Sequence, residues 1–179
     1  MAASSLMPRK YAQLLFRLVR HYQSQHIIEL GTSFGITTAY LAAGNPGAKL
    51  ITCEGVPSIA TIAGKGFGEL GLTNIELVEG DFAATLSPVL ARLKNVDLAF
   101  IDGNHRKVST LSYFHQLLQY STSSTILVFD DIHWSKEMEE AWALIRQEPS
   151  VTLTIDLFFT GIVFFDGGIK IPQHFVLRF

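Results

Sequence analysis

The chain has little cysteine and no long apolar run. Cys53 is the only cysteine among its 179 residues, so no disulfide can form within the chain. No apolar stretch approaches the length that spans a bilayer, and the N-terminus lacks the apolar core of a signal peptide. We therefore expect a cytoplasmic protein without a membrane segment, in which Cys53 is a small core residue rather than a nucleophile.

An excess of charge of one sign is also missing. Lysine and arginine number 14, aspartate and glutamate 16, and the basic residues are scattered rather than clustered. Nucleic-acid backbones and anionic membranes require a basic surface, so the sequence argues against both as partners and favours a small-molecule substrate. With 48% hydrophobic residues, we expect one domain over residues 1–179, with a leading helix near 7–24, a core near 25–166 and a tail at 167–179.

Short apolar runs alternate with stretches of helical length through most of the chain. This βαβ rhythm predicts an α/β fold with a Rossmann-like, doubly wound sheet of five parallel strands. The expected strands are His26–Leu30, Leu50–Cys53, Ile75–Val78, Val96–Ile101 and Thr125–Phe129. Two later β-rich runs, Val151–Phe158 and Gly161–Phe165, are joined too closely for a helix, so we expect a C-terminal antiparallel hairpin.

Helix starts and the tail are also readable. Ser87 followed by Pro88 predicts an N-cap with proline at the first helical position, and Ser135 predicts a second capped helix. The alternation of Phe175, Leu177 and Phe179 predicts an edge strand or a cover over an apolar patch.

A glycine-rich turn follows the first expected strand. The run Ile27–Gly35 contains Glu29, Gly31 and Gly35, and glycines there let the backbone approach a ligand at a strand end. Glu54 ends the next strand roughly 20 positions beyond the first glycine, where this architecture places a carboxylate on ribose hydroxyls. The pair predicts a bound nucleoside.

The glycine spacing is E-x-G-x-x-x-G, which resembles motif I of class I S-adenosylmethionine-dependent methyltransferases. A sulfonium and an ammonium favour a nearby acid such as Glu29, whereas a pyrophosphate favours free N–H groups at a helix N-terminus. Parallel strands closed by an antiparallel hairpin are also what that fold family shows. The resemblance implies S-adenosylmethionine as cofactor. It implies cofactor contacts by Glu29, Gly31, Thr32, Ser33, Gly35, Glu54, Asp81, Phe82 and Asp102.

Carboxylates also follow the fourth and fifth expected strands. Asp102, Asp130 and Asp131 resemble the ligand positions of metal-dependent O-methyltransferases of the catechol and caffeoyl-coenzyme A type, with Asp131 standing where that group has asparagine. The resemblance implies Mg²⁺ or another divalent cation held against the acceptor's hydroxyls. The alternative is that one acid orients the cofactor while the others cap helices or bind backbone amides.

Two histidines are candidates for the base that deprotonates the acceptor. His105 stands three residues after Asp102, where the catechol-type pattern has its catalytic lysine. His133 follows Asp131 by two residues and is a candidate base, metal ligand or acceptor contact. An imidazole with an ordinary pKa near ~6.5 can accept a proton at neutral pH. The catalytic candidates are therefore Asp102, His105 and His133.

The strand-end combination of Asp102–His105 with Asp130–Ser135 looks most like a compact bacterial class I methyltransferase family. The predicted activity is methyl transfer from S-adenosylmethionine to a small-molecule acceptor, with oxygen as the favoured nucleophile. A binding module without catalysis and a nicotinamide-nucleotide-binding protein are the alternatives. Because Trp134, Phe158 and Phe159 predict an exposed apolar rim, we also expect a homodimer in which the leading helix or the tail covers the partner's crevice.

Overall fold

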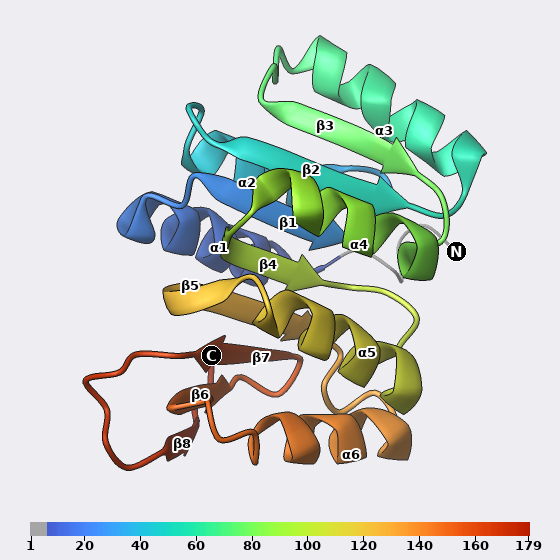
Figure 1. Ribbon diagram of the computed structural model, residues 1–179. Helices are drawn as coiled ribbons and strands as arrows, with labels where there is room; N and C mark the ends of the chain where they lie inside the picture. Colours follow the sequence, from blue (N-terminus) through green and yellow to red (C-terminus); the bar gives the residue numbers. More distant parts are fainter. Residues whose placement is uncertain (1–6) are drawn as a thin grey trace. The chain divides into compact units, whose positions relative to one another are not determined.

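The computed structural model describes residues 7–179, in which helices and strands alternate up to the helix that ends at Ile145 and three strands then follow (Figure 1). These residues group into two units, the first ending at Thr85 and the second running from Leu86 to Phe179. The boundary falls inside helix α4 (Phe82–Leu93). A single domain over the whole chain stays a prediction.

The first unit contains a parallel three-stranded sheet in which β2 lies between β1 and β3. Its strands are β1 (His26–Leu30), β2 (Lys49–Glu54) and β3 (Ile75–Glu79). In the β1–β2 register, Ile28 is opposite Ile51 and Glu29 is opposite Thr52, so the apolar runs pair as buried neighbours. The parallel β2–β3 pair places Glu54 beside Glu79 at the strand ends. The three predicted strands are confirmed.

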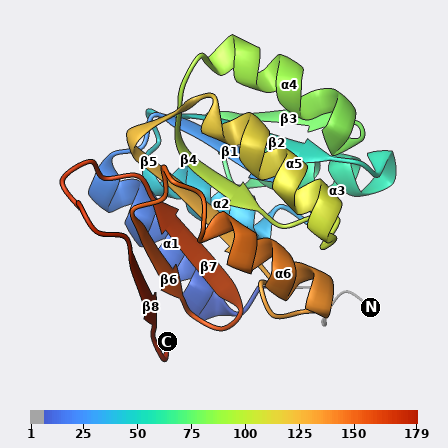
Figure 2. The same ribbon diagram turned by 60° about the horizontal axis from the view of Figure 1, so that its bottom comes forward.

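Three helices belong to this unit: α1 (Arg9–Tyr22), α2 (Ile36–Gly44) and α3 (Pro57–Glu69). Helix α1 lies beside α2 in both views (Figures 1 and 2), and it buries Tyr11, Leu15 and Val19 on one face, as the helical spacing of its apolar residues predicts. Helix α3 begins with Pro57 at its first position, where the missing N–H costs no hydrogen bond.

The second unit combines a parallel pair with the predicted hairpin. Strand β4 (Val96–Ile101) is parallel to β5 (Ser121–Asp130), and β5 is antiparallel to β7 (Thr160–Phe164). Strand β7 is antiparallel to β6 (Leu153–Asp156), which pairs in parallel with β8 (Gln173–Val176). An α/β fold with a mostly parallel sheet and a C-terminal antiparallel hairpin is thus confirmed, and the tail adds the predicted edge strand.

Helices α5 (Lys107–Leu118) and α6 (Lys136–Ile145) lie side by side in the second unit (Figure 2). The predicted cap is present, because Ser135 Oγ accepts from the Met138 N–H at 3.3 Å. Helix α6 packs Trp142 on β7 at Gly161, where a Cβ would lie 2.6 Å from the indole. The glycine is therefore required for close packing of α6 on the hairpin.

The predicted start of α4 at Ser87 and Pro88 is wrong. The helix begins at Phe82, and Pro88 lies inside it. Asp81 Oδ1 accepts from the Ala83 N–H at 2.8 Å, so the aspartate caps the helix about two turns before the proline. Within residues 7–179, no helix is long and apolar enough to cross a bilayer.

Candidate cofactor turn and acidic cluster

The turn after β1 is built from residues with left-handed backbone. Gly31, Ser33 and Gly35 have φ of 102°, 47° and 78°. The N–H groups of Gly31 and Thr32 donate to the Cys53 carbonyl at 3.0 and 3.2 Å, and the Gly35 N–H donates to the Thr32 carbonyl at 2.8 Å. These bonds close a tight turn between β1 and α2, so the predicted glycine turn is present.

Glu54 is attached directly to this turn. Its Oε2 accepts from the Ser33 N–H at 2.9 Å, and its Oε1 accepts from the Val56 N–H at 2.9 Å. The side chain is buried. The structure therefore brings Glu54 together with the turn, as the spacing predicts. Each carboxylate oxygen keeps a further lone pair that can accept from a ribose hydroxyl, and that contact stays a prediction.

Glu29 lies beneath the turn and is fully buried. Its Oε2 accepts from the Thr52 hydroxyl at 2.6 Å and from the Thr38 hydroxyl, and the hydroxyls of Thr52 and Thr32 are 2.6 Å apart. Neither Thr38 nor Thr52 was predicted as a partner of Glu29. For Thr52 the signal was the strand register, because β1 and β2 start in step and this places Glu29 opposite Thr52. Glu29 thus supports the turn through hydroxyls, and its direct contact with a ligand stays a prediction.

Asp81 and Phe82 follow β3. The Asp81 carboxylate is occupied in capping α4, and Phe82 is half-buried. This helix cap is a structural role that explains Asp81 without a ligand. Contact of either residue with an adenine stays a prediction.

The predicted strand-end carboxylates of the second unit lie close together around His105. His105 Nε2 is 3.4 Å from Asp102 Oδ1 and 3.9 Å from Asp131 Oδ2. The backbone is left-handed at Asn104, His105 and Asp131, with φ of 64°, 25° and 55°. Non-glycine residues rarely adopt this conformation, and such strain concentrates at functional sites.

Burial and mutual repulsion perturb these groups. Burial, followed by the negative charges of Asp102 and Asp131, raises the pKa of Asp130 to about 7, although the Thr160 hydroxyl, 3.0 Å from Asp130 Oδ1, acts the other way. Burial also raises the pKa of Asp131. The hydrogen bond with Asp102, followed by the charges of the aspartates, raises the pKa of His105 above its ordinary value. The three carboxylates thus repel one another, and His105 is the basic side chain that lies beside two of them.

Carboxylate oxygens are suitable ligands for a hard divalent cation, but these side chains are not arranged around a common point where a cation could bind. In the described part of the chain, no three or more histidine, cysteine, aspartate or glutamate side chains are arranged to hold a metal ion. His105 instead faces both Asp102 and Asp131. A divalent cation on Asp102, Asp130 and Asp131 therefore stays a prediction.

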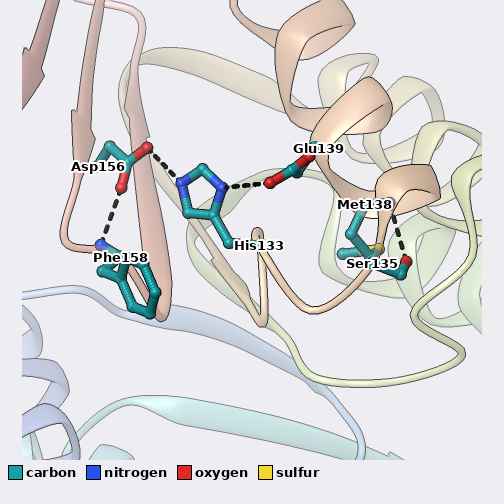
Figure 3. Close-up of polar contacts among 6 residues, drawn as sticks. All are labelled: His133, Ser135, Met138, Glu139, Asp156 and Phe158. Atoms are coloured by element: carbon teal, nitrogen blue, oxygen red, sulfur yellow. Dashed lines mark hydrogen bonds and ion pairs between the residues drawn. The ribbon is translucent and has the colours of Figure 1, made fainter.

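His133 makes different contacts from His105. Its Nε2 is 2.8 Å from Asp156 Oδ2, and its Nδ1 is 3.4 Å from Glu139 Oε1 (Figure 3). Both ring nitrogens thus face these carboxylates rather than the three aspartates around His105. Asp156 was not predicted from the sequence, because it lies inside the expected run Val151–Phe158, whereas β6 ends at Asp156 in the structure.

Comparison with known proteins shows the family to which the chain belongs. A family model described as Methyltransferase domain matches residues 28–132, which include the glycine turn, Glu54 and all three aspartates. The chain belongs to this methyltransferase family. The match ends before the C-terminal hairpin. Both His133 and Asp156 therefore lie outside the residues that the family model matches.

Two curated relatives are named catechol O-methyltransferase. The one from Niastella koreensis is 33% identical over 137 residues, which are 74% of this chain and 60% of the relative. The one from Mycobacterium tuberculosis is 30% identical over 112 residues, 62% of this chain and 49% of the relative. The methyltransferase domain thus spans about half to three fifths of the length of the curated relatives it matches.

Solved structures show the same fold. An O-methyltransferase from Bacillus cereus in complex with SAH has a TM-score of 0.76 at 23% identity, covering 91% of this chain and 86% of that one. The O-methyltransferase TomG from Streptomyces achromogenes, in complex with SAM, has a TM-score of 0.79 at 22% identity, covering 91% and 82%. The methyltransferase domain therefore has the fold of these enzymes.

Proposed function

We propose that this chain transfers a methyl group from S-adenosylmethionine to a hydroxyl oxygen of a small-molecule acceptor. The observation that carries the proposal is the glycine turn after β1 with the Glu54 carboxylate hydrogen-bonded to it. The family match supports it, as do structural neighbours solved in complex with SAM or SAH. A bacterial source, a cytoplasmic location and the absence of nucleic-acid and membrane partners stay predictions from the sequence.

The first unit is proposed to hold the cofactor. Gly31 and Gly35 open the backbone to a ligand, and Glu54 offers oxygen lone pairs to ribose hydroxyls. When bound, S-adenosylmethionine supplies an activated methyl group on a sulfonium sulfur. Spacing of the glycines as E-x-G-x-x-x-G disfavours the nicotinamide-nucleotide alternative, which uses G-x-G-x-x-G.

The second unit is proposed to handle the acceptor. A hydroxyl that accepts a methyl group must lose its proton, and His105 is the base we assign, because it lies within the aspartate cluster. Asp102 orients the imidazole and stabilises its protonated form. His133 is the less suitable base, since both of its nitrogens face carboxylates.

An acceptor screen tests the proposal. The protein is incubated with S-adenosylmethionine and separate catechols, phenols, sugars and small carboxylates, and released S-adenosylhomocysteine is quantified by mass spectrometry. We expect release that depends on at least one hydroxyl acceptor. Binding of the cofactor without turnover on any acceptor class would instead favour the binding module without catalysis.

The predicted divalent cation has its own test. If Asp102, Asp130 and Asp131 bind Mg²⁺, calorimetric titration with MgCl₂ will give a saturable heat that Asp130→Asn removes. Turnover will fall after EDTA treatment and return with added Mg²⁺. Asp166→Asn, which changes an exposed aspartate shortly after β7, is the matched control. Turnover that survives both exhaustive EDTA treatment and Asp130→Asn would contradict a role for a divalent cation in the reaction.

A homodimer is proposed from the tail. All four residues of β8 are exposed, and β8 is the last strand of the second unit's sheet, so Phe175 and Val176 leave apolar surface at an edge. Light scattering at micromolar concentration is expected to give twice the 19.8 kDa mass of one chain. Val176→Lys should give monomers, because a charge on an edge strand opposes pairing.

Val108→Lys is the matched control for the dimer. Val108 on α5 is 79% exposed and Val176 is 77% exposed, so the two changes add the same charge at equally open positions. A monomeric mass for the unsubstituted chain, both with and without S-adenosylhomocysteine, would contradict the dimer.

A further inference from the structure

The turn between β6 and β7 carries two exposed phenylalanines in an unfavourable arrangement. Phe158 is 63% exposed and Phe159 48% exposed, and the apolar rim predicted from the sequence is confirmed at these positions. Phe158 also has a φ of 74°, a left-handed conformation that bulky side chains rarely adopt. Neither its exposure nor its backbone conformation helps the fold, and such strain persists where the surrounding structure enforces it.

The enforcing group is Asp156, a buried carboxylate at the end of β6. Its Oδ1 accepts from the Phe158 N–H at 2.8 Å, and its Oδ2 is 2.8 Å from His133 Nε2 (Figure 3). The imidazole of His133 stacks with the Phe158 ring at 5.6 Å between centroids and 29° between planes. Phe159 meets Phe158 edge-on at 5.2 Å and 88°. Asp156 thus holds His133 and Phe158 directly, and Phe159 packs against Phe158, which gives an aromatic platform of three rings: His133, Phe158 and Phe159.

The platform is also bonded to the segment that carries the aspartates. The Thr160 hydroxyl donates to Asp130 Oδ1 at 3.0 Å, and the Ile132 N–H donates to the Phe159 carbonyl at 3.3 Å. Because β5 and β7 also pair at Asp130 and Thr160, the position of the platform relative to Asp130 is set by backbone and side-chain bonds together. The turn that carries the exposed rings is therefore fixed to the end of β5, where Asp130 and Asp131 lie.

We propose that Phe158 binds the face of a planar aromatic acceptor and so determines specificity, with Asp156 and His133 as positioning residues. The inference rests on the methyl transfer proposed above. A flat ring gains stacking energy on a fixed aromatic face, whereas a sugar or an aliphatic acid has no ring face to offer. The carboxylate oxygens of the neighbouring acidic cluster can accept hydrogen bonds from the hydroxyl groups of that ring. The occupant is accordingly a phenol or a catechol rather than an aliphatic alcohol.

Equilibrium binding of 4-nitrocatechol tests the platform without turnover. The titration is followed by absorbance with S-adenosylhomocysteine present. Phe158→Ala is expected to weaken binding about tenfold, the size of a lost ring contact, and Phe158→Tyr to bind as the unsubstituted chain does. Leu144→Ala is the matched control, because it shortens an apolar side chain that is 43% exposed on α6. In turnover, Phe158→Ala should raise the KM for catechol about tenfold and leave the KM for S-adenosylmethionine unchanged.

Two results would overturn the inference. One is equal 4-nitrocatechol affinity for Phe158→Ala and the unsubstituted chain. The other is an unsubstituted chain that binds S-adenosylhomocysteine and methylates an aliphatic acceptor but does not bind 4-nitrocatechol. Failure to bind S-adenosylhomocysteine at all would contradict the proposed function itself, so the two failures are distinguishable.

Discussion

Replacing Gly31 by valine is expected to weaken S-adenosylhomocysteine binding by on the order of 100-fold. The glycine has a φ of 102°, which a β-branched residue does not adopt, and its N–H donates to the Cys53 carbonyl at 3.0 Å. Valine must therefore move the turn, and with it the Ser33 N–H that Glu54 holds. A ligand that depends on both the turn and Glu54 loses its site. Isothermal titration calorimetry measures the change.

Gly66→Val is the matched control for this prediction. Gly66 lies in α3, and a Cβ there meets nothing within 4 Å. The control should bind S-adenosylhomocysteine as the unsubstituted chain does. Equal affinity of Gly31→Val and the control would show that the glycine turn is not the cofactor site.

The second large effect is expected at His105. Replacing it by alanine should lower kcat by on the order of 10² to 10⁴, the usual contribution of a general base, and leave S-adenosylhomocysteine binding intact. His115→Ala, on the exposed face of α5, is the matched control. An unchanged kcat for His105→Ala would exclude His105 as the base.

The pH profile separates a base from a structural histidine. A base must be neutral to accept a proton, and the pKa of His105 is raised, first by its hydrogen bond with Asp102. The kcat should therefore rise with pH, with an inflection above the ordinary histidine pKa of 6.5. Asp102→Asn removes the largest cause of the shift, so the inflection should move to lower pH. An inflection that does not respond to Asp102→Asn would contradict the pairing.

The parts of the structure that could be predicted depend on local pattern. The glycine turn was readable because Gly31 and Gly35 follow an apolar run, and Glu54 was readable because this architecture places an acid at the next strand end. The hairpin was readable because the link between its runs is too short for a helix. In each case, the deciding residues are close together in the sequence or related by a known spacing.

The missed parts depend on contacts between distant residues. The hydroxyl of Thr52 meets Glu29 because of the β1–β2 register, and the hydroxyl of Thr38 reaches the same carboxylate from α2. Asp156 pairs with His133 across 23 positions, and nothing in either segment alone indicates the partner. The start of α4 was misplaced because Ser87 and Pro88 are a good helix start in isolation, while Asp81 already caps the helix. Burial and long-range hydrogen bonds therefore decided what local pattern left open.

Calorimetric titration of the unsubstituted chain with S-adenosylhomocysteine tests the central claim most directly. A saturable heat with micromolar affinity, on the order of −7 to −8 kcal/mol, is the predicted result. S-adenosylmethionine should compete for the same site, and NADH should give no heat. No detectable heat with S-adenosylhomocysteine or S-adenosylmethionine would contradict the claim that the glycine turn and Glu54 hold a methyl-donor cofactor.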